Sequence, residues 1–318
     1  MMTPDAGRRL RLALAAIWLI DAALQYQPFM FTRAFGQMLA GSAQGNPSFI
    51  AGPITWSAGI VGHHPAVTNS AFATIQLLLA IGIAWRPAVK FALAASVAWS
   101  IAVWWLGEGL GGVLTGSPTP WNGAPGAVIL YALLAVLLWP ADRDASASFV
   151  AGRPLGRLPA RLLWLVLWGS MAYLALQAAR TAPQGLHDML SSMASGEPGW
   201  IASIDHGAAA LLAQHGQQGS AVLAVVFEVI AIGIFLPAPA ARVAVILAVA
   251  AAAVIWVVGE DFGAIFTGSA TDPNSGLLLG LLAVAYWPAR NTVSATADSA
   301  ADPAASQPLM AADPASGY

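Results

Sequence analysis

The sequence predicts an all-α integral membrane protein. Eight transmembrane helices form two parallel four-helix repeats, with amphipathic helices on the extracytoplasmic side. Three observations lead to this fold class. Only 9% of the 318 residues are charged, against about 25% in soluble proteins, while 58% are hydrophobic. Several apolar runs approach the length that crosses a hydrocarbon core of about 30 Å. The chain also contains an internal duplication.

The composition excludes several classes of function. The low charge and the long apolar runs exclude a soluble enzyme. A formal net charge of -2 without a basic block excludes nucleic acid as a partner. The absence of cysteine excludes disulfides, thiol chemistry and thiolate-ligated metal or iron-sulfur centres.

The duplication is read from two similar stretches. WWLGEGLGGVLTGSPT begins at Trp104, and WVVGEDFGAIFTGSAT begins 152 residues later, at Trp256. Upstream, Trp18 aligns with Trp168 at an offset of 150 residues. We therefore divide the chain into a first repeat over 1–147, a second repeat over 148–292 and a disordered cytoplasmic tail over 293–318.

Each repeat contains four apolar runs. In the first they lie near 12–30, 67–85, 89–106 and 125–140, and in the second near 160–178, 220–236, 241–258 and 276–288. Several are shorter than the usual span of about 20 residues. Because the number in each repeat is even, both repeats have the same orientation across the bilayer.

The basic residues set the orientation. In an eight-span arrangement, every Lys and Arg except Arg33 and Arg180 falls on one face, which the positive-inside rule assigns to the cytoplasm. Both termini then lie in the cytoplasm, and the protein lies in the cell (inner) membrane. A cleaved signal peptide is the alternative for the first run, but Asp21 within it and its counterpart in the second repeat favour a true span.

Two outer segments, over 31–66 and 179–219, contain apolar residues at helical spacing. They predict amphipathic helices on the extracytoplasmic side. Two roles are open for them: anchors that lie in the membrane interface, or lids that fold over a site.

The repeated pattern Gly-Glu-x-x-Gly-x-x-x-Thr-Gly-Ser directly follows the third span of each repeat, over 107–117 and 259–269. Its glycines permit close backbone approach or positive φ. One interpretation is a tightly packed helix end and turn. The other is an outer vestibule in which the glutamates bind a cation or proton, or act as acid or base. The vestibule candidates are Glu108, Thr115, Ser117, Glu260, Thr267 and Ser269.

His64 and His215 are the histidines that the duplication pairs, and each precedes the second span of its repeat. Together with Glu108 and Glu260 they are candidate ligands of a divalent metal, although no tight ligand spacing is present. Structural hydrogen bonding is the alternative for the histidines.

Asp21 and Glu228 are the carboxylates near the middle of predicted spans. A charge at the bilayer centre costs at least about 2.5 kcal/mol on insertion scales, so each is a candidate coupling group. The alternative is a protonated carboxyl hydrogen-bonded between helices. The tryptophans near span ends are typical of interface anchors; they include Trp18, Trp104, Trp105, Trp139, Trp168, Trp256 and Trp287.

The organisation of each repeat, with one span, a long outer excursion, two closely joined spans and a fourth after a Gly-rich loop, resembles the four-helix membrane proteins of the DoxX/DoxD group. Some members of that group are implicated in quinone-linked sulfur or redox metabolism. The resemblance covers organisation and carries over no catalytic residue. The Ala-rich, Lys-poor composition also resembles that of membrane proteins from high-GC actinobacteria.

Three hypotheses follow. The first is a small-molecule or ion permease with a path between the halves, coupled through Asp21 and Glu228. The second is an accessory membrane subunit of a quinone-linked redox or metal-handling system, with a divalent metal or a quinone as its candidate cofactor. The third is a structural scaffold in the lipid bilayer that binds lipid or a partner membrane protein. The sequence identifies no catalytic set and favours a role other than that of an enzyme.

Overall fold

The computed structural model describes residues 4–116, 118–141, 143–144, 147–195 and 197–288, and this part of the chain is helical and contains no strand. The vestibule candidate Ser117 and the predicted tail over 293–318 lie outside these residues. The all-α prediction is confirmed.

The longer helices follow one another in a similar order in the two halves, with differences in the short elements between them. The first half contains α1 (Pro4–Leu24), η1 (Pro28–Phe31), α2 (Arg33–Gly41), α3 (Ser48–His63), α4 (Pro65–Ala84), α5 (Val89–Leu106), η2 (Gly109–Gly112), η3 (Pro120–Asn122) and α6 (Ala127–Leu137). The second contains α7 (Gly152–Leu155), α8 (Arg157–Thr181), α9 (Gly185–Met193), α10 (Gly199–Leu212), α11 (Gly216–Gly233), α12 (Ala238–Val254), the π-helix η4 (Ile255–Gly259), η5 (Asp261–Ala264) and α13 (Asn274–Ala285).

Five described helices are long and apolar enough to cross a membrane: α4, α5, α8, α11 and α12 extended through η4. A helix also occupies each of the other three predicted span positions. α1 contains Arg8, Arg9, Arg11 and Asp21, and α6 and α13 have 11 and 12 residues, about 17 Å at 1.5 Å per residue. The exposed faces of the long helices are apolar, with large side chains such as Phe91, Val166 and Val225 on the surface. Such faces favour contact with lipid.

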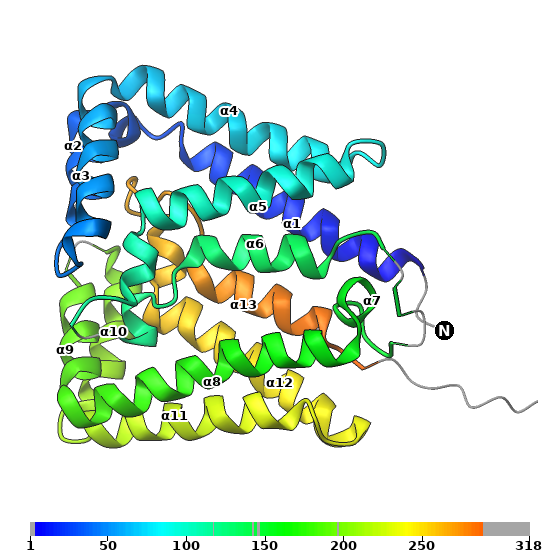
Figure 1. The fold of residues 1–318 in the computed structure, drawn as a ribbon. Coiled ribbons are helices and arrows are strands. Elements are labelled where there is room, and N and C mark those ends of the chain that lie inside the picture. Colours follow the sequence, from blue (N-terminus) through cyan, green and yellow to red (C-terminus); the bar gives the residue numbers. More distant parts are fainter. Residues whose placement is uncertain (1–3, 117, 142, 145–146, 196, 289–318) are drawn as a thin grey trace, which may run out of the picture.

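The long helices lie side by side, and the short helices gather at the ends of the bundle. Figure 1 shows α2, α3, α9 and α10 at one end. The α4–α5 turn, the α11–α12 turn and the connection through α7 lie at the opposite end, with the N-terminus. The predicted amphipathic segments and the predicted basic loops are therefore at opposite ends.

Aromatic side chains fill the core between the helices. Trp164 donates from Nε1 to the Ile230 carbonyl at 2.9 Å, and the Tyr286 hydroxyl donates to the Ala160 carbonyl at 2.6 Å. Trp18 and Trp168 are 2% and 0% exposed, so the expectation that they anchor the membrane interface is wrong for both. Each indole instead packs against core rings, Trp18 on Tyr131 and Trp168 on Phe227.

The α2–α3 pair is held by a close backbone crossing. A Cβ added to Gly36 of α2 would lie 2.7 Å from Cα and N of Gly62 in α3, which is inside van der Waals contact. Leu39 and Phe72 pack around Met30, Phe35 and Val61 beside this crossing. The first outer segment is therefore a packed helical hairpin that rests on α4.

We expect Gly36→Ala to destabilise the protein by about 1–3 kcal/mol, because the new methyl group overlaps the α3 backbone. Gly41→Ala is the matched control in the same helix, since a Cβ at Gly41 meets nothing within 4 Å. Its unfolding free energy should stay within about 0.5 kcal/mol of the wild type. Denaturant unfolding in detergent micelles measures both, and equal values for the two variants would contradict the crossing.

Candidate functional site

The repeated Gly-Glu pattern folds into the same backbone turn in both halves. Leu110 and Gly111 have φ of 57° and 62°, and Phe262 and Gly263 have φ of 59° and 75°. A Cβ on Gly111 would lie 2.2 Å from the Pro125 carbonyl carbon. The same addition at Gly263 would lie 2.5 Å from that atom of Pro273. Glycine is needed here for both positive φ and close backbone approach, as the sequence predicts.

In the first half, the turn binds the start of the last helix. The Trp104 indole donates to the Pro125 carbonyl at 2.7 Å. The Glu108 carboxylate accepts the Val128 N–H of α6, at 3.2 Å to Oε1 and 3.3 Å to Oε2. A carboxylate at this position satisfies an unpaired first-turn N–H and faces the positive end of the helix dipole.

The second half repeats this arrangement at α13. The Trp256 indole donates to the Pro273 carbonyl at 2.9 Å. Glu260 accepts the N–H groups of Ser275 and Gly276 at 3.2 and 2.8 Å, and also accepts the Ser275 hydroxyl. The repeated tryptophan and glutamate therefore have a structural function in both halves, which agrees with the helix-end interpretation of the pattern.

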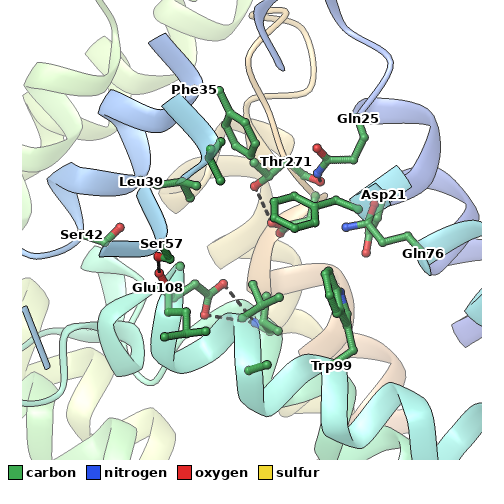
Figure 2. A pocket seen from close by; sticks show the side chains of 18 of the residues that line it. Asp21, Gln25, Phe35, Leu39, Ser42, Ser57, Gln76, Trp99, Glu108 and Thr271 are labelled. Carbon is green, nitrogen blue, oxygen red and sulfur yellow. Dashed lines mark hydrogen bonds between the residues drawn. The ribbon is translucent and has the colours of Figure 1, made fainter. Parts of the chain in front are cut away.

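Glu108 differs from Glu260 because it also borders two pockets. The inner pocket has a volume of about 300 Å³ and lies among α1 to α6 of the first half. Figure 2 shows Asp21, Gln25 and Gln76 on one side of it and Glu108 on the other. The α2 and α3 side chains Phe35, Leu39, Ser42, Ser57 and Val61 cover it, so the first outer segment lies over a pocket.

The outer pocket is larger than the inner pocket, and more of its wall is formed by glycine backbone. Its volume is about 640 Å³, and glycines of the loop after α5 line it together with Thr115 and Asn46. Ser42 and Glu108 line both pockets. The two spaces therefore meet at these two side chains, with Glu108 at the junction.

A loop from the second half closes the inner pocket. Gln25 donates to the Thr271 carbonyl at 3.4 Å and Gln27 donates to the Ala270 carbonyl at 3.1 Å. Both contacts place Asp272 in the pocket wall. The Asp272 carboxylate accepts the Thr271 hydroxyl and the Asn274 N–H, each at 2.8 Å.

Burial controls the protonation of the carboxyls at the pocket mouth. Burial and the nearby Asp272 raise the pKa of Glu108 to about 8, against the lowering effect of the Val128 N–H. Burial raises the pKa of Asp272 itself, although Thr271 and Asn274 oppose the rise. Glu260 lines neither of these pockets, and burial raises its pKa to about 7.

Several buried oxygens around the inner pocket accept no hydrogen bond from the part of the protein that the structure describes. They are Oδ1 of Asp21, Oε1 of Gln25, Oε1 of Gln76 and the Tyr131 hydroxyl. An unpartnered buried polar group costs roughly 1–3 kcal/mol, so such a concentration indicates a place for a polar ligand or for water.

The corresponding region of the second half is filled by hydrocarbon. At the alignment offsets, Met171 stands for Asp21, Phe227 for Gln76 and Leu279 for Tyr131. All three are at most 2% exposed and belong to one packed core. These three residues therefore leave no counterpart of the polar wall that Asp21, Gln76 and Tyr131 form.

The predicted site residues have different fates. Asp21, Glu108 and Thr115 line the two pockets. Thr267 and Ser269 hydrogen-bond each other at 2.9 Å in an exposed turn. Thr267, Ser269 and Glu260 line neither pocket.

Glu228 does not share a pocket with Asp21. It is exposed on α11, in an apolar groove that also contains Val229, Ile232 and residues of α12. The predicted pair of coupling carboxylates therefore does not converge in this structure.

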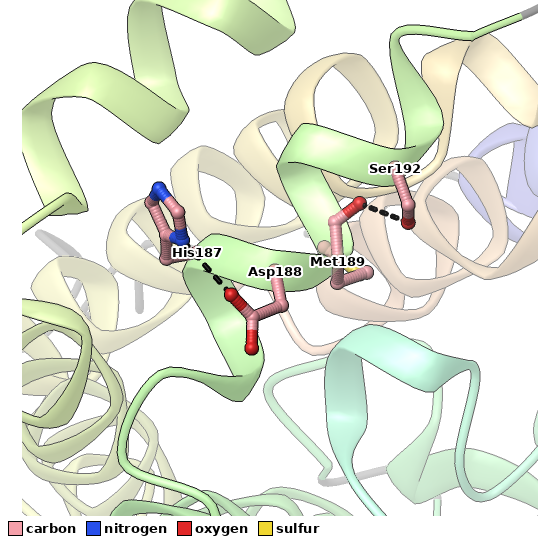
Figure 3. A network of polar contacts seen from close by, with 4 residues as sticks. All are labelled: His187, Asp188, Met189 and Ser192. Carbon is pink, nitrogen blue, oxygen red and sulfur yellow. Dashed lines mark hydrogen bonds and ion pairs between the residues drawn. The ribbon is translucent and has the colours of Figure 1, made fainter.

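The candidate metal ligands are not brought together. His64 and His215 are exposed residues that precede α4 and α11. Among the described residues, no group of three or more His, Cys, Asp or Glu side chains is placed to hold a metal ion. His187 and Asp188 form a separate exposed pair on α9, with Nδ1 and Oδ1 at 3.0 Å (Figure 3).

A second acidic pair was not recognised from the sequence. Asp205 of α10 and Asp261 of η5 are 0% and 3% exposed. Burial and the neighbouring Asp205 raise the pKa of Asp261 to about 7, and burial raises the pKa of Asp205. Each carboxyl therefore favours its protonated form, because burial disfavours its charge, and at Asp261 the proximity of Asp205 does so as well.

Comparison with protein-family models, with curated proteins and with solved structures gives no match for this chain. The site is therefore interpreted from its own geometry.

The raised pKa of Glu108 makes stability depend on pH. Between its ordinary pKa of 4.5 and about 8, the folded protein holds a proton that the unfolded chain has lost, so stability falls as pH rises through this range. Glu108→Gln removes this titration. Between pH 5 and 8 the free energy of unfolding of the wild type should fall. We expect that of the variant to fall by at least about 1.4 kcal/mol less.

Chemical unfolding at several pH values measures this difference. Asp188→Asn is the control, because the Asp188 side chain is 71% exposed and lies away from the pockets. Its unfolding free energy should follow the wild-type pH profile. A Glu108→Gln profile parallel to that of the wild type would contradict a protonated Glu108.

Proposed function

We propose that this chain is a multi-pass inner-membrane permease for a small molecule, with the inner pocket of the first half as its substrate site. The observation that carries the proposal is the pair of pockets that share Ser42 and Glu108 in their walls. In this proposal the two pockets form a route from the outer end of the bundle to buried polar groups on α1, α4 and α6. A ligand site of this kind, mostly apolar with a few convergent polar groups, is typical of small-molecule recognition.

The proposal includes eight spans and cytoplasmic termini. Its support is the separation in Figure 1, where the α2, α3, α9 and α10 helices lie opposite the α4–α5 and α11–α12 turns. Arg86 is in the first of these turns, and Arg242 is near the start of α12. In this topology α1, α6 and α13 also cross the bilayer, packed among longer helices. The matched turns at Glu108 and Glu260 support two parallel repeats, an organisation that resembles the DoxX/DoxD group.

The proposed substrate path does not run between the two halves, unlike the path that the sequence predicts. Its pocket belongs to the first half, and the second half contributes the wall at Thr271 and Asp272. Glu108 and Asp272, rather than Glu228, accompany Asp21 as the coupling carboxyls of this proposal. Glu108 lies at the junction through which a substrate enters.

A quinone-linked redox subunit is the second candidate. The aromatic rings of Trp18, Phe72 and Trp99 line the inner pocket and favour a flat ring as ligand. A pure scaffold is less consistent with the pocket, because a scaffold has no use for buried oxygens without partners.

Single cysteines test the permease, since the natural chain contains none. Ala102 of α5 lines the inner pocket, and Ala102→Cys adds only a thiol there. We expect a membrane-impermeant thiol reagent to label it from the outer face of cells and, during turnover between two access states, also in inside-out vesicles. Labelling from the outer face alone would contradict a permease and favour a receptor or redox subunit.

Two further positions control this experiment. Ala250→Cys lies on the exposed apolar face of α12 and should react with the reagent from neither side. Pro87→Cys, in the α4–α5 turn, should react only in inside-out vesicles. Labelling of Pro87→Cys in intact cells would overturn the eight-span topology.

A further inference from the structure

We propose that the inner pocket recognises a small protonated organic amine, with N–H donors at one end and an apolar, preferably aromatic, body. This inference rests on the proposed function, because it names the substrate class of the same pocket. Three properties of the pocket lead to it: the kind of polar atom left unpaired, the sign of its ionisable groups and the chemistry of its walls.

The unpaired atoms are mainly acceptors. Oδ1 of Asp21 and the amide oxygens of Gln25 and Gln76 accept no hydrogen bond from the described residues, and the Tyr131 hydroxyl beside Asp21 is the neighbouring donor. Carboxylate and amide oxygens accept hydrogen bonds and cannot donate them. A ligand that completes these contacts therefore needs several donors, and an ammonium group supplies up to three N–H groups.

The ionisable groups favour a cation. Asp21, Glu108 and Asp272 line the inner pocket, and no Lys, Arg or His of the described chain lines either pocket. An anionic ligand would meet carboxyls without any compensating positive charge. A buried cation, by contrast, obtains the opposite charge that its desolvation requires.

The walls favour an apolar body beside the charge. Trp18 packs against Tyr131 with ring centroids 4.2 Å apart and planes tilted by 41°, and Phe72 meets Trp99 edge-on at 5.5 Å. Aromatic faces attract organic cations and pack against apolar groups. At about 300 Å³, the pocket holds a small ligand rather than a lipid or a peptide.

Binding of the ammonium and protonation of Glu108 oppose each other across the pocket. The titratable groups that face Glu108 are Asp21 on α1, Tyr131 on α6 and Asp272 from the second half, whereas α2 to α5 contribute none of their own to the pocket wall. The pKa of Glu108, about 8, leaves this carboxyl largely protonated at neutral pH. Binding of the ammonium favours the carboxylate, so the O–H bond of Glu108 breaks and its proton leaves through the outer pocket.

Calorimetric titration of the purified full-length protein in nanodiscs tests the inference. The probes are 2-phenylethylamine, its neutral alcohol, its N,N,N-trimethyl form and the quinone menadione. We expect the primary amine to bind at least about tenfold more tightly than the alcohol or the trimethyl form, which lack charge or N–H donors. Its affinity should rise up to about tenfold per pH unit between pH 6 and 8, as the proton becomes easier to displace.

Equal binding of the alcohol or the trimethyl form would overturn the inference, as would absence of binding by the amine at millimolar concentration. Menadione binding without amine binding would also overturn it, in favour of the quinone candidate. These comparisons use the unaltered protein, so they do not depend on the folding of a variant. They are also independent of cysteine labelling, so failure here leaves the permease proposal to its own test.

Variants then locate the binding site. Asp21→Asn should weaken amine binding at least about tenfold, and Gln76→Phe should abolish it by filling the pocket with the side chain found at Phe227. Glu228→Gln is the matched control, because this carboxyl lies on α11 outside the pocket. Equal loss in Glu228→Gln and Asp21→Asn would place the amine elsewhere and overturn the assignment. Thermal unfolding verifies that each variant is folded.

Discussion

The last helix of each half begins against a glutamate carboxylate, and the arrangement of the site depends on this contact. The α6 and α13 helices are short, and the residues of their first turns, among them Val128 and Ser275, are buried. An unsatisfied N–H at such depth would cost several kcal/mol, so a fixed acceptor is required. Glu108 and Glu260 supply it from the turns after α5 and η4. The glycines of these turns allow the backbone to come close enough for the contact.

The same requirement explains why Glu108 can serve two purposes. Glu260 uses both oxygens on the N–H groups and hydroxyl of α13, and burial leaves it no other partner. Among the described residues, Glu108 accepts the Val128 N–H alone, and its side chain borders the two pockets. In the second half the Ser275 hydroxyl hydrogen-bonds the glutamate. In the first half the corresponding side of Glu108 faces a pocket with room for a ligand. The same structural contact therefore leaves this carboxyl accessible in one half.

The sequence predicts the parts of this protein that depend on local pattern. Helical segments occur at all eight apolar runs, and the glycines of the repeated pattern have the backbone roles expected of them. The pocket is not predictable in the same way, because Gln76 and Tyr131 are single polar residues in apolar helices that tertiary packing brings together. Asp272 reaches the pocket only because Gln25 and Gln27 hold its loop. Trp18 and Trp168 were misassigned for a related reason: position along a span does not reveal which way an indole points.

The loop that carries Asp272 connects the two halves of the chain at the inner pocket. It belongs to the second half, yet it forms a wall of the pocket in the first and is held there by α1. A protein made of the first half alone would therefore have an incomplete binding site. If the chain arose by the duplication that the sequence predicts, an ancestor with one repeat would need a second copy beside it to provide this wall. Fusion would then fix the two copies at equal stoichiometry, and it would allow Met171 and Phe227 to fill one pocket while the other keeps its polar groups.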